Sequence, residues 1–284
     1  MKILSIILTV ILSNLAIMGF SQGTTVYTGK ENISLGLTVF AGQNALQNTL
    51  PDAYTYSEKS MVSPGGEIEL NYSLSRFLGL GIGLGYQNFK SELTLDDYSS
   101  TLSSIDNEGD NFIMEISGNS ISDKQSLGLL TIPVSVQLKV PVSSKLFLFV
   151  QPGICVSIPV LKKSSTTGTF TYNGYYPDYN VTLTDLPQYG FASNYQSTDE
   201  NKLPTSRMIL LSQTRAGITY SLNYKLSLSA GLSYLKSLSN VVENTEDELL
   251  TTSMDDLKST SVLSTKGSLS GISGFINISW FIFR

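Results

Sequence analysis

The chain has 284 residues, a formal net charge of −5 and 14% charged residues, whereas typical soluble domains carry roughly 25%. This acidic balance excludes a nucleic-acid-binding role, which needs clustered basic side chains. Histidine is absent and Cys155 is the single cysteine, which excludes Ser-His-Asp and Cys-His catalysis, His-ligated zinc and an internal disulfide. We therefore expect a protein that is not an enzyme and uses no metal or other cofactor.

The first 21 residues have the pattern of a secretory signal peptide. Lys2 supplies the positive charge, an apolar run covers 3–12, and the small residues Gly19 and Ser21 precede a cleavage site before Gln22. The alternative, an uncleaved membrane anchor, is disfavoured because the run is shorter than the ~20 residues of a spanning helix. Residues 22–284 are then one domain.

Beyond the signal peptide, apolar and polar residues alternate with period two, which predicts β-strands rather than helices. The eight predicted strands are 33–42, 66–74, 77–90, 127–140, 145–156, 207–222, 225–235 and 269–283. The third strand contains "FLGLGIGLGY", with glycine at every second position. We expect this glycine face to point into a barrel lumen and to leave room for larger side chains from opposite strands.

Short and long connections alternate between these strands. The four long connections are 43–65, 91–126, 157–206 and 236–268. Short turns on one side and long loops on the other are typical of an eight-stranded antiparallel up-and-down transmembrane β-barrel. An even strand number places both termini in the periplasm. A soluble barrel with an apolar lumen is the alternative, but the polar faces here carry Gly and Ser instead of Lys and Glu.

Aromatic residues stand at matching depths on the apolar faces. Tyr72, Tyr220 and Trp280 lie near the short turns or the C-terminus, and Tyr86 and Tyr234 lie about one membrane thickness further on. Together with "LLTIPVSVQLKV", "KLSLSAGLSY" and the ending "SWFIFR", these strands resemble the porin-like outer-membrane β-barrel family, which includes OmpA-type and PorT-like barrels. The resemblance implies a Gram-negative outer-membrane location and leaves the long loops unmatched.

Charged and amide side chains on the polar faces predict a cluster inside the lumen. Glu69 and Arg215 stand at similar heights on opposite sides of the barrel, and a buried charge needs a partner. The predicted cluster consists of Glu67, Glu69, Gln137, Gln151, Arg215 and Asn277. Structural packing is the simpler interpretation, and a proton or solute path is the alternative.

The long loops suggest surface interactions. The aromatic stretch "FTYNGYYPDYN" predicts a binding surface with Tyr172, Tyr175, Tyr176 and Tyr179. It also fits a β-hairpin that turns at Asn173-Gly174.

Two other loops are acidic, 91–126, which includes Asp123, and 236–268. In the first of them, "DNEGD" (106–110) places three carboxylates within reach of one Ca²⁺. Its glycine does not fit an EF-hand loop, so a solvated acidic surface is the simpler expectation.

We expect a structural or surface-interaction protein with a filled lumen. Its partners would be outer-membrane lipid and an extracellular or neighbouring membrane protein. The alternative is a transport-class role, as a small-solute porin or a PorT-like secretion accessory.

Overall fold

A computed structural model describes residues 32–243, 249–250 and 257–283 of the chain. The predicted signal peptide, 1–21, lies outside the described residues. The unit Asn32–Arg284 is compact by itself. No helix among the described residues has the length and apolar character needed to cross a membrane.

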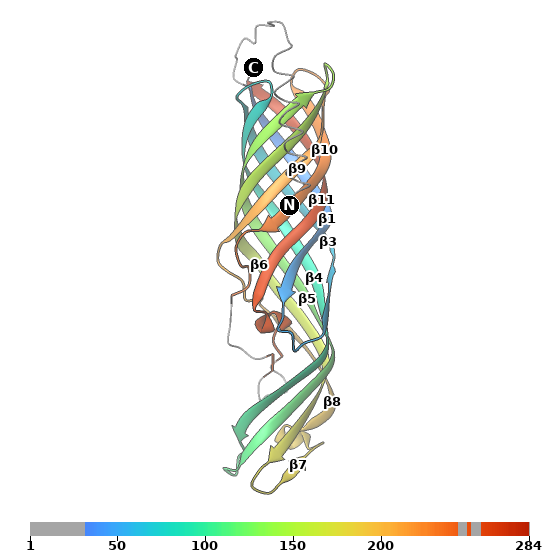
Figure 1. Cartoon of the computed structure of the whole chain (residues 1–284), viewed down its shortest axis with the longest axis vertical. Helices are drawn as coiled ribbons and strands as arrows, with labels where there is room; N and C mark the ends of the chain where they lie inside the picture. The colour runs from blue at the N-terminus through green and yellow to red at the C-terminus, as the bar shows by residue number, and fades with distance from the viewer. Residues whose placement is uncertain (1–31, 244–248, 251–256, 284) are drawn as a thin grey trace. The chain divides into compact units, whose positions relative to one another are not determined.

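Eight antiparallel strands close into a barrel (Figure 1). Around the ring they are β1 (Asn32–Thr49), β3 (Val62–Ser73), β4 (Leu78–Ile105), β5 (Asn111–Pro141), β6 (Leu146–Tyr176), β9 (Ile209–Ser221), β10 (Leu226–Ser237) and β11 (Lys266–Phe283). Strand β1 pairs with β11 from Ile33 to Thr49, with one register shift between Ile33 and Ser34, which closes the barrel without a free edge. The predicted fold class, an eight-stranded antiparallel up-and-down barrel, is confirmed.

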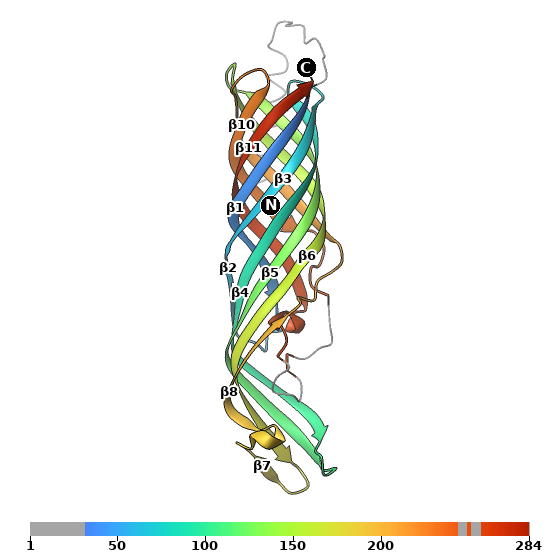
Figure 2. The ribbon, with the colours of Figure 1, turned by 180° about the vertical axis from the view of Figure 1, so that it is seen from behind.

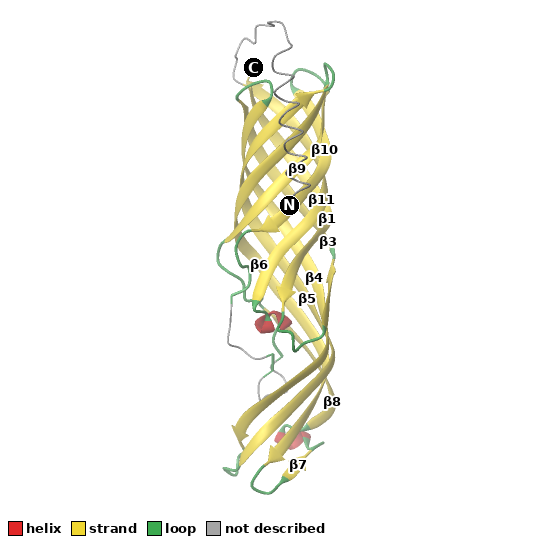
Figure 3. Ribbon diagram, in the orientation of Figure 1, coloured by secondary structure: helices red, strands yellow, loops and turns green. Residues whose placement is uncertain are grey.

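Three short strands and two short 3₁₀ helices add to one end of this barrel. Strand β2 (Tyr56–Ser60) pairs with β4, whereas β7 (Val181–Leu183) and β8 (Ala192–Asn201) pair with β6. The helices η1 (Pro187–Tyr189) and η2 (Thr260–Leu263) are red in Figure 3. We call the barrel end that carries these short strands and helices the loop end. The turn end carries the tight connections 74–77, 142–145 and 222–225.

The barrel is apolar outside, whereas its interior is largely polar toward the turn end and apolar toward the loop end. Along β1, Leu37 and Val39 are exposed while Thr38 and Phe40 are buried, and the same alternation continues on the neighbouring strands. Inward positions carry Gly, Ser, Thr and the charged residues, because a strand sends successive side chains to opposite faces. The predicted orientation of the two faces therefore holds throughout the barrel wall.

Strands β4, β5 and β6 contain 28, 31 and 31 residues, whereas the other five barrel strands contain 12 to 18. Seen from behind, these three strands continue past the others (Figure 2). The predicted loop 91–126 is thus mostly a β-hairpin, and much of 157–206 is strand. The prediction was wrong there because it stopped each strand at membrane length, although Phe112, Met114 and Ile116 keep the period-two pattern.

The continuing strands form a loop-end sheet with its own apolar core. Two adjacent residues are exposed at Asp96–Asp97 on β4 and again at Asn119–Ser120 on β5. On the barrel side of these positions the nearest buried residues have odd numbers, and on the loop-end side they have even numbers. The core contains Leu93, Leu95, Tyr98, Phe112, Met114, Ile116, Ile121, Phe170, Tyr172, Tyr176 and Phe191, together with Leu50, Leu249, Leu250 and Leu257. This region therefore buries apolar side chains, as a soluble sheet does.

Candidate functional site

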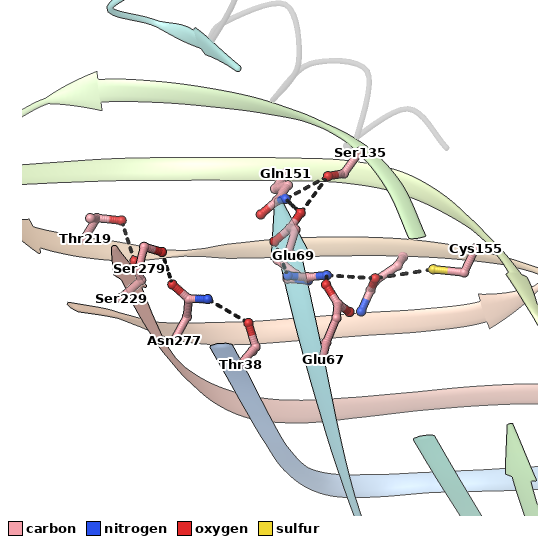
Figure 4. Close-up of polar contacts among 12 residues, drawn as sticks. Thr38, Glu67, Glu69, Ser135, Gln151, Cys155, Thr219, Ser229, Asn277 and Ser279 are labelled. Atoms are coloured by element: carbon pink, nitrogen blue, oxygen red, sulfur yellow. Dashed lines mark hydrogen bonds and ion pairs between the residues drawn. The ribbon is translucent and has the colours of Figure 1, made fainter. Parts of the chain in front are cut away.

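A charged cluster occupies the middle of the lumen. Arg215 donates to Glu69 Oε2 at 3.1 Å and pairs with Glu67 through its other terminal nitrogen. Gln151 Nε2 donates to Glu69 Oε1 at 2.5 Å and to Ser135 Oγ at 2.8 Å. Figure 4 shows Gln151 and Ser135 both in contact with Glu69. The structure thus brings together four of the six residues that the sequence places in the lumen.

The topology explains how these residues meet. Glu67 and Glu69 are two apart on β3 and face the same way, while Arg215 lies on β9, four strands away in either direction around the ring. Arg215 is only 3% exposed, and its Cζ also lies 5.4 Å from the centre of the Phe40 ring. A buried guanidinium is tolerated here because carboxylates, an amide and an aromatic face surround it.

The glycine row supplies the space for this cluster. Gly79, Gly81 and Gly85 are buried and face the lumen. A Cβ on Gly81 would meet Glu69, Ser135 Oγ at 2.6 Å and Asn71 Oδ1 at 2.8 Å. The atoms that fill the space come from the adjacent strands β3 and β5, whereas the sequence analysis expected opposite strands. The Glu69 side chain lies over Gly81, and from there its carboxylate accepts a hydrogen bond from Arg215.

The other two predicted residues, Gln137 and Asn277, lie next to the charged cluster. Asn277 Nδ2 donates to Thr38 Oγ1 at 2.8 Å, and Ser279 donates to Asn277 Oδ1 at 2.6 Å. Gln137 and Asn277 line a cavity of about 30 Å³ together with Glu69, Gln151 and Arg215. This volume is about the share of one water molecule in the liquid. The polar residues therefore form two hydrogen-bonded groups with little free space.

Apolar side chains also fill the lumen, both beside the charged cluster and toward the loop end. Phe40, Phe149 and Phe275 pack together, with ring centres 6.3 and 6.1 Å apart. Toward the loop end follows a second apolar cluster of Leu46, Phe89, Leu127, Leu129, Cys155, Leu203, Ile209, Leu211, Leu235, Val241, Val242 and Leu269. Cys155 is one of these buried residues, and its thiol contacts Gln213 Oε1 at 3.4 Å. The lumen is thus filled by side chains.

Asp123 is a buried carboxylate that the sequence analysis had placed on a solvated acidic loop. The residue is 0% exposed. Its Oδ1 accepts from Ser164 and Thr166, and its Oδ2 accepts from Gln125, Ser259 and both the N–H and the hydroxyl of Thr260. The solvated-surface prediction is wrong at this position. These bonds tie the segment before η2 to β5 and β6.

The continuing period-two pattern of Ile121, Asp123, Gln125 and Leu127 was the signal that could have placed Asp123 on the inside. It was missed because a lone acid in a polar stretch looks like surface.

The acidic residues of the 236–268 connection fall mostly outside the description. Glu246, Asp247, Glu248, Asp255 and Asp256 are outside the described residues, and Glu243 is exposed.

The tip of the loop-end sheet carries an acidic and aromatic hollow of about 400 Å³. It is lined by Asp106, Asn107, Glu108, Asp110, Tyr176, Tyr179, Val181, Leu183 and Tyr189. Tyr176 Oη donates to Asp106 Oδ2 and Tyr179 Oη donates to Asp110 Oδ2, both at 3.1 Å. Tyr179 and Tyr189 are 63% and 62% exposed. The hollow joins the β4–β5 turn to the segment after β6.

Hydrogen bonding fixes the charge of these groups. The N–H of Asp110 and the N–H of Glu108 donate to Asp106, which lowers the pKa of that carboxyl. Burial, followed by the bond to Asp106, raises the pKa of Tyr176. The bond to the Asp110 carboxylate raises the pKa of Tyr179. At neutral pH the Asp106 carboxylate is therefore an ionised acceptor, and the Tyr176 and Tyr179 phenols are donors.

The "DNEGD" stretch is the β4–β5 turn. Asp106 Oδ1 is engaged by two backbone N–H groups within the turn. Among the residues that the structure describes, no group of three or more potential metal ligands occurs.

The four predicted loop tyrosines do not share one surface. Tyr172 and Tyr176 are buried in the loop-end core, Tyr175 is half-buried, and Tyr179 is exposed. Asn173-Gly174 lies inside β6, so the predicted turn is wrong and the chain turns at 177–180. A Cβ on Gly174 would meet the Phe191 ring, so this glycine serves close packing.

No protein family matches the chain, and no curated protein matches it. Solved structures with a similar fold include Neisserial surface protein A, with 10% identity over 86% of this chain and 96% of that one, at a TM-score of 0.36. The attachment invasion locus protein Ail of Yersinia pestis, in complex with a heparin analogue, shows 8% identity over 89% and 99%, at 0.29. The translocator domain of the autotransporter NalP from Neisseria meningitidis shows 9% identity over 97% and 96%, at 0.24. All three are outer-membrane β-barrel proteins. At such values the likeness carries no argument about function.

Proposed function

We propose that this chain spans a bacterial outer membrane and acts as a non-enzymatic surface-interaction protein through its loop-end sheet. The turn end, with the start of β1 and the end of β11, would face the periplasm. The loop end would face the outside of the cell and meet an extracellular or neighbouring membrane protein. A narrower assignment to OmpA-type or PorT-like barrels stays a prediction.

The outer wall supports the membrane location. Leucine, isoleucine and valine side chains stand exposed on every barrel strand, for example Leu37 at 57%, Val134 at 56% and Ile276 at 54%. In water, such a continuous apolar wall would be unfavourable, whereas lipid chains cover it at no cost. Closure of the ring pairs the strand edges, as a membrane barrel requires.

The filled lumen argues against a static diffusion pore. The charged cluster lies beside the three phenylalanines, and the second apolar cluster fills the interior further toward the loop end. Of these side chains, Arg215 is held by contacts on several sides and would have to leave its carboxylates for a solute to pass. A porin-like role is therefore the less supported alternative.

The hollow at the tip carries the interaction proposal. It combines exposed tyrosine rings with acidic side chains, and tyrosine provides a large contact area at low entropic cost. The core beneath holds the β4–β5 turn and the segment after β6 in place. This surface favours a partner segment that carries positive charge and apolar area.

The test is site-specific photo-crosslinking on intact cells. A photoreactive residue at Tyr179 should yield one defined adduct, and adding Glu108→Ser and Tyr189→Ser should weaken it. Tyr224 is equally exposed, at 63%, but lies at the turn end and serves as the matched control. Equal adducts at both positions, or none at Tyr179, would contradict the proposal.

Conductance measurements in planar lipid bilayers distinguish the proposed surface-interaction role from the transport-class role. The folded chain should give no steady conductance in planar membranes. Stable open channels in the parent protein would favour the transport-class role instead.

A further inference from the structure

We propose that a lysine-lined hollow on the outer wall of the barrel binds the phosphate group of an outer-leaflet lipid. This inference rests on the proposed membrane location and goes beyond it, because it assigns a headgroup chemistry to one site. The hollow measures about 790 Å³ and is lined by Lys124, Lys162, Lys163 and Lys202, with Val160, Leu161, Ser164, Ser165, Glu200 and Asn201.

The strand register places this hollow at the upper limit of the apolar wall. On β5 and β6, exposed Leu130 pairs with exposed Ile158. The pairs that follow toward the loop end are Gly128 with Leu161, Ser126 with Lys163, and Lys124 with Ser165. The outward side chains therefore change from aliphatic to basic within a few residues. This order of side chains, aliphatic and then basic, matches the change from the lipid tails to the lipid headgroups of a membrane.

Tyr86 marks the same boundary. Its ring lies over Gly128, where an added Cβ would meet Tyr86 Cζ at 3.0 Å. Val160 is 58% exposed directly beside the basic residues. A ligand in this hollow would touch apolar wall on one side and ammonium groups on the other, as an amphiphilic anion does.

The charge of the hollow is positive in a chain that is negative overall. Within the described residues, the ion pairs are those of Arg215 with Glu67 and Glu69, so none involves these lysines. Lys162 donates to the Thr205 carbonyl at 2.9 Å, while Lys124, Lys163 and Lys202 are exposed.

Three carboxylates lie nearby. Glu200 lines the hollow, and Glu92 is the cross-strand neighbour of Lys124 and accepts from Ser122 at 3.0 Å. Asp123 is buried on the opposite side of the sheet, within six hydrogen bonds from neutral donors. The three exposed lysines, Lys124, Lys163 and Lys202, outnumber the two carboxylates, whereas Lys162 pairs with inward Leu127. The unpaired ammonium groups therefore favour an anion.

A lipid phosphate is the occupant that fits both features. Lysine binds phosphate as a point charge, and its long stem lets the ammonium reach the headgroup level while the methylenes stay on apolar surface. A free phosphate would use the lysines but leave the apolar side of the hollow empty. A neutral lipid would cover the apolar side of the hollow but leave the lysines without an anion.

The experiment titrates the folded, full-length mature chain in uncharged detergent with lipid A that carries its phosphates and with the same lipid after dephosphorylation. Binding is counted by native mass spectrometry. The triple variant Lys124→Gln, Lys163→Gln, Lys202→Gln should bind the phosphorylated lipid at least about tenfold more weakly, since each surface lysine contributes to anion binding. Its binding of the dephosphorylated lipid should not change.

Two further variants control for charge and folding. Arg76→Gln, Lys145→Gln, Lys225→Gln removes three exposed cations from the turn end and should leave binding unchanged. The triple Lys→Arg variant of the hollow should retain it. Heat-modifiable gel mobility reports whether each variant has folded.

Several results would overturn the inference. These are equal binding of the two lipids by the parent, an equal loss in the turn-end variant, or full displacement by inorganic phosphate at the lipid's own concentration. Failure of the parent to insert into vesicles would instead contradict the proposed membrane location, so the two failures are distinguishable.

Discussion

Strands β4, β5 and β6 run through two regions that bury opposite kinds of side chain. Inside the barrel, β4 presents glycines, while β3, β5 and β6 present Glu69, Ser135 and Gln151. Beyond the barrel, the same strands bury Tyr98, Phe112 and Phe170. The surroundings explain the difference. A wall that faces lipid puts its apolar side chains outward, whereas a sheet that faces water packs them together.

The comparison also shows how each region is held. The barrel closes on itself, so its polar interior needs only internal hydrogen bonds. The loop-end sheet does not close, and its core is completed by segments from distant loops, such as Leu50 and Leu257. We therefore expect changes in the lumen to affect the whole barrel and changes at the loop end to stay local.

The largest effect is expected for Arg215→Met. This variant leaves Glu67 and Glu69 buried without their cation, which costs about 3 to 5 kcal/mol. Urea-induced unfolding in lipid vesicles would measure the loss of stability. The triple variant Glu67→Gln, Glu69→Gln, Arg215→Met should recover most of it, because no uncompensated charge remains. A stable single variant would mean that the cluster does not depend on the ion pair.

Gly81→Leu should overpack the lumen. The new side chain would displace Glu69 and Ser135, at a cost of about 1 to 3 kcal/mol. Gly274→Leu is the matched control, because Gly274 is exposed on the outer wall and its added Cβ would meet only Ala41 O, at 3.9 Å. The urea midpoints of unfolding of the two variants are compared, and the midpoint of Gly81→Leu should be lower. Equal midpoints would show that the glycine row does not need to be empty.

Asp123→Asn should loosen the segment before η2 and leave the barrel folded. The amide has one oxygen acceptor in place of two, so some of the six donors lose their partner, at about 1 to 2 kcal/mol. Limited proteolysis should cut faster near Ser259, while the heat-modifiable mobility of the barrel stays as in the parent. An unchanged cleavage rate would contradict this role of Asp123.

The smallest effect concerns pH at the tip. A raised tyrosine pKa gives stability that is present below the unfolded-state value near 10 and is lost as the pH rises through the folded-state value. The lowered pKa of Asp106 gives stability that is present above about 3.9 and is lost as the pH falls through the folded-state value. The tip contacts should therefore be intact across neutral pH.

Ultraviolet absorbance titration checks this expectation. The signal that Tyr176→Phe or Tyr179→Phe removes from the parent curve should lie above pH 10. Tyr224→Phe is the comparison, because Tyr224 lies at the turn end. A tip signal at ordinary tyrosine pH would contradict the hydrogen bonds to Asp106 and Asp110.

The sequence by itself determined the barrel. The period-two alternation fixed strand type and the side of each residue, and the alternation of short and long connections fixed the up-and-down order. It also placed Glu69 and Arg215 inside, because both stand on polar faces at similar heights above their turns. The apolar outer wall follows from the same pattern.

The tertiary structure decided what alternation leaves open. Strand length was one such feature, since polar faces look alike in a strand and in a loop, and β4 to β6 extend far beyond membrane length. Contacts between segments that are distant in the sequence were a second feature that the alternation did not predict. Asp123 meets Ser259 and Thr260 more than 130 residues later, and Lys124, Lys163 and Lys202 come together only because β5, β6 and β8 lie side by side. Such pairings depend on register and on loop docking, which no local pattern encodes.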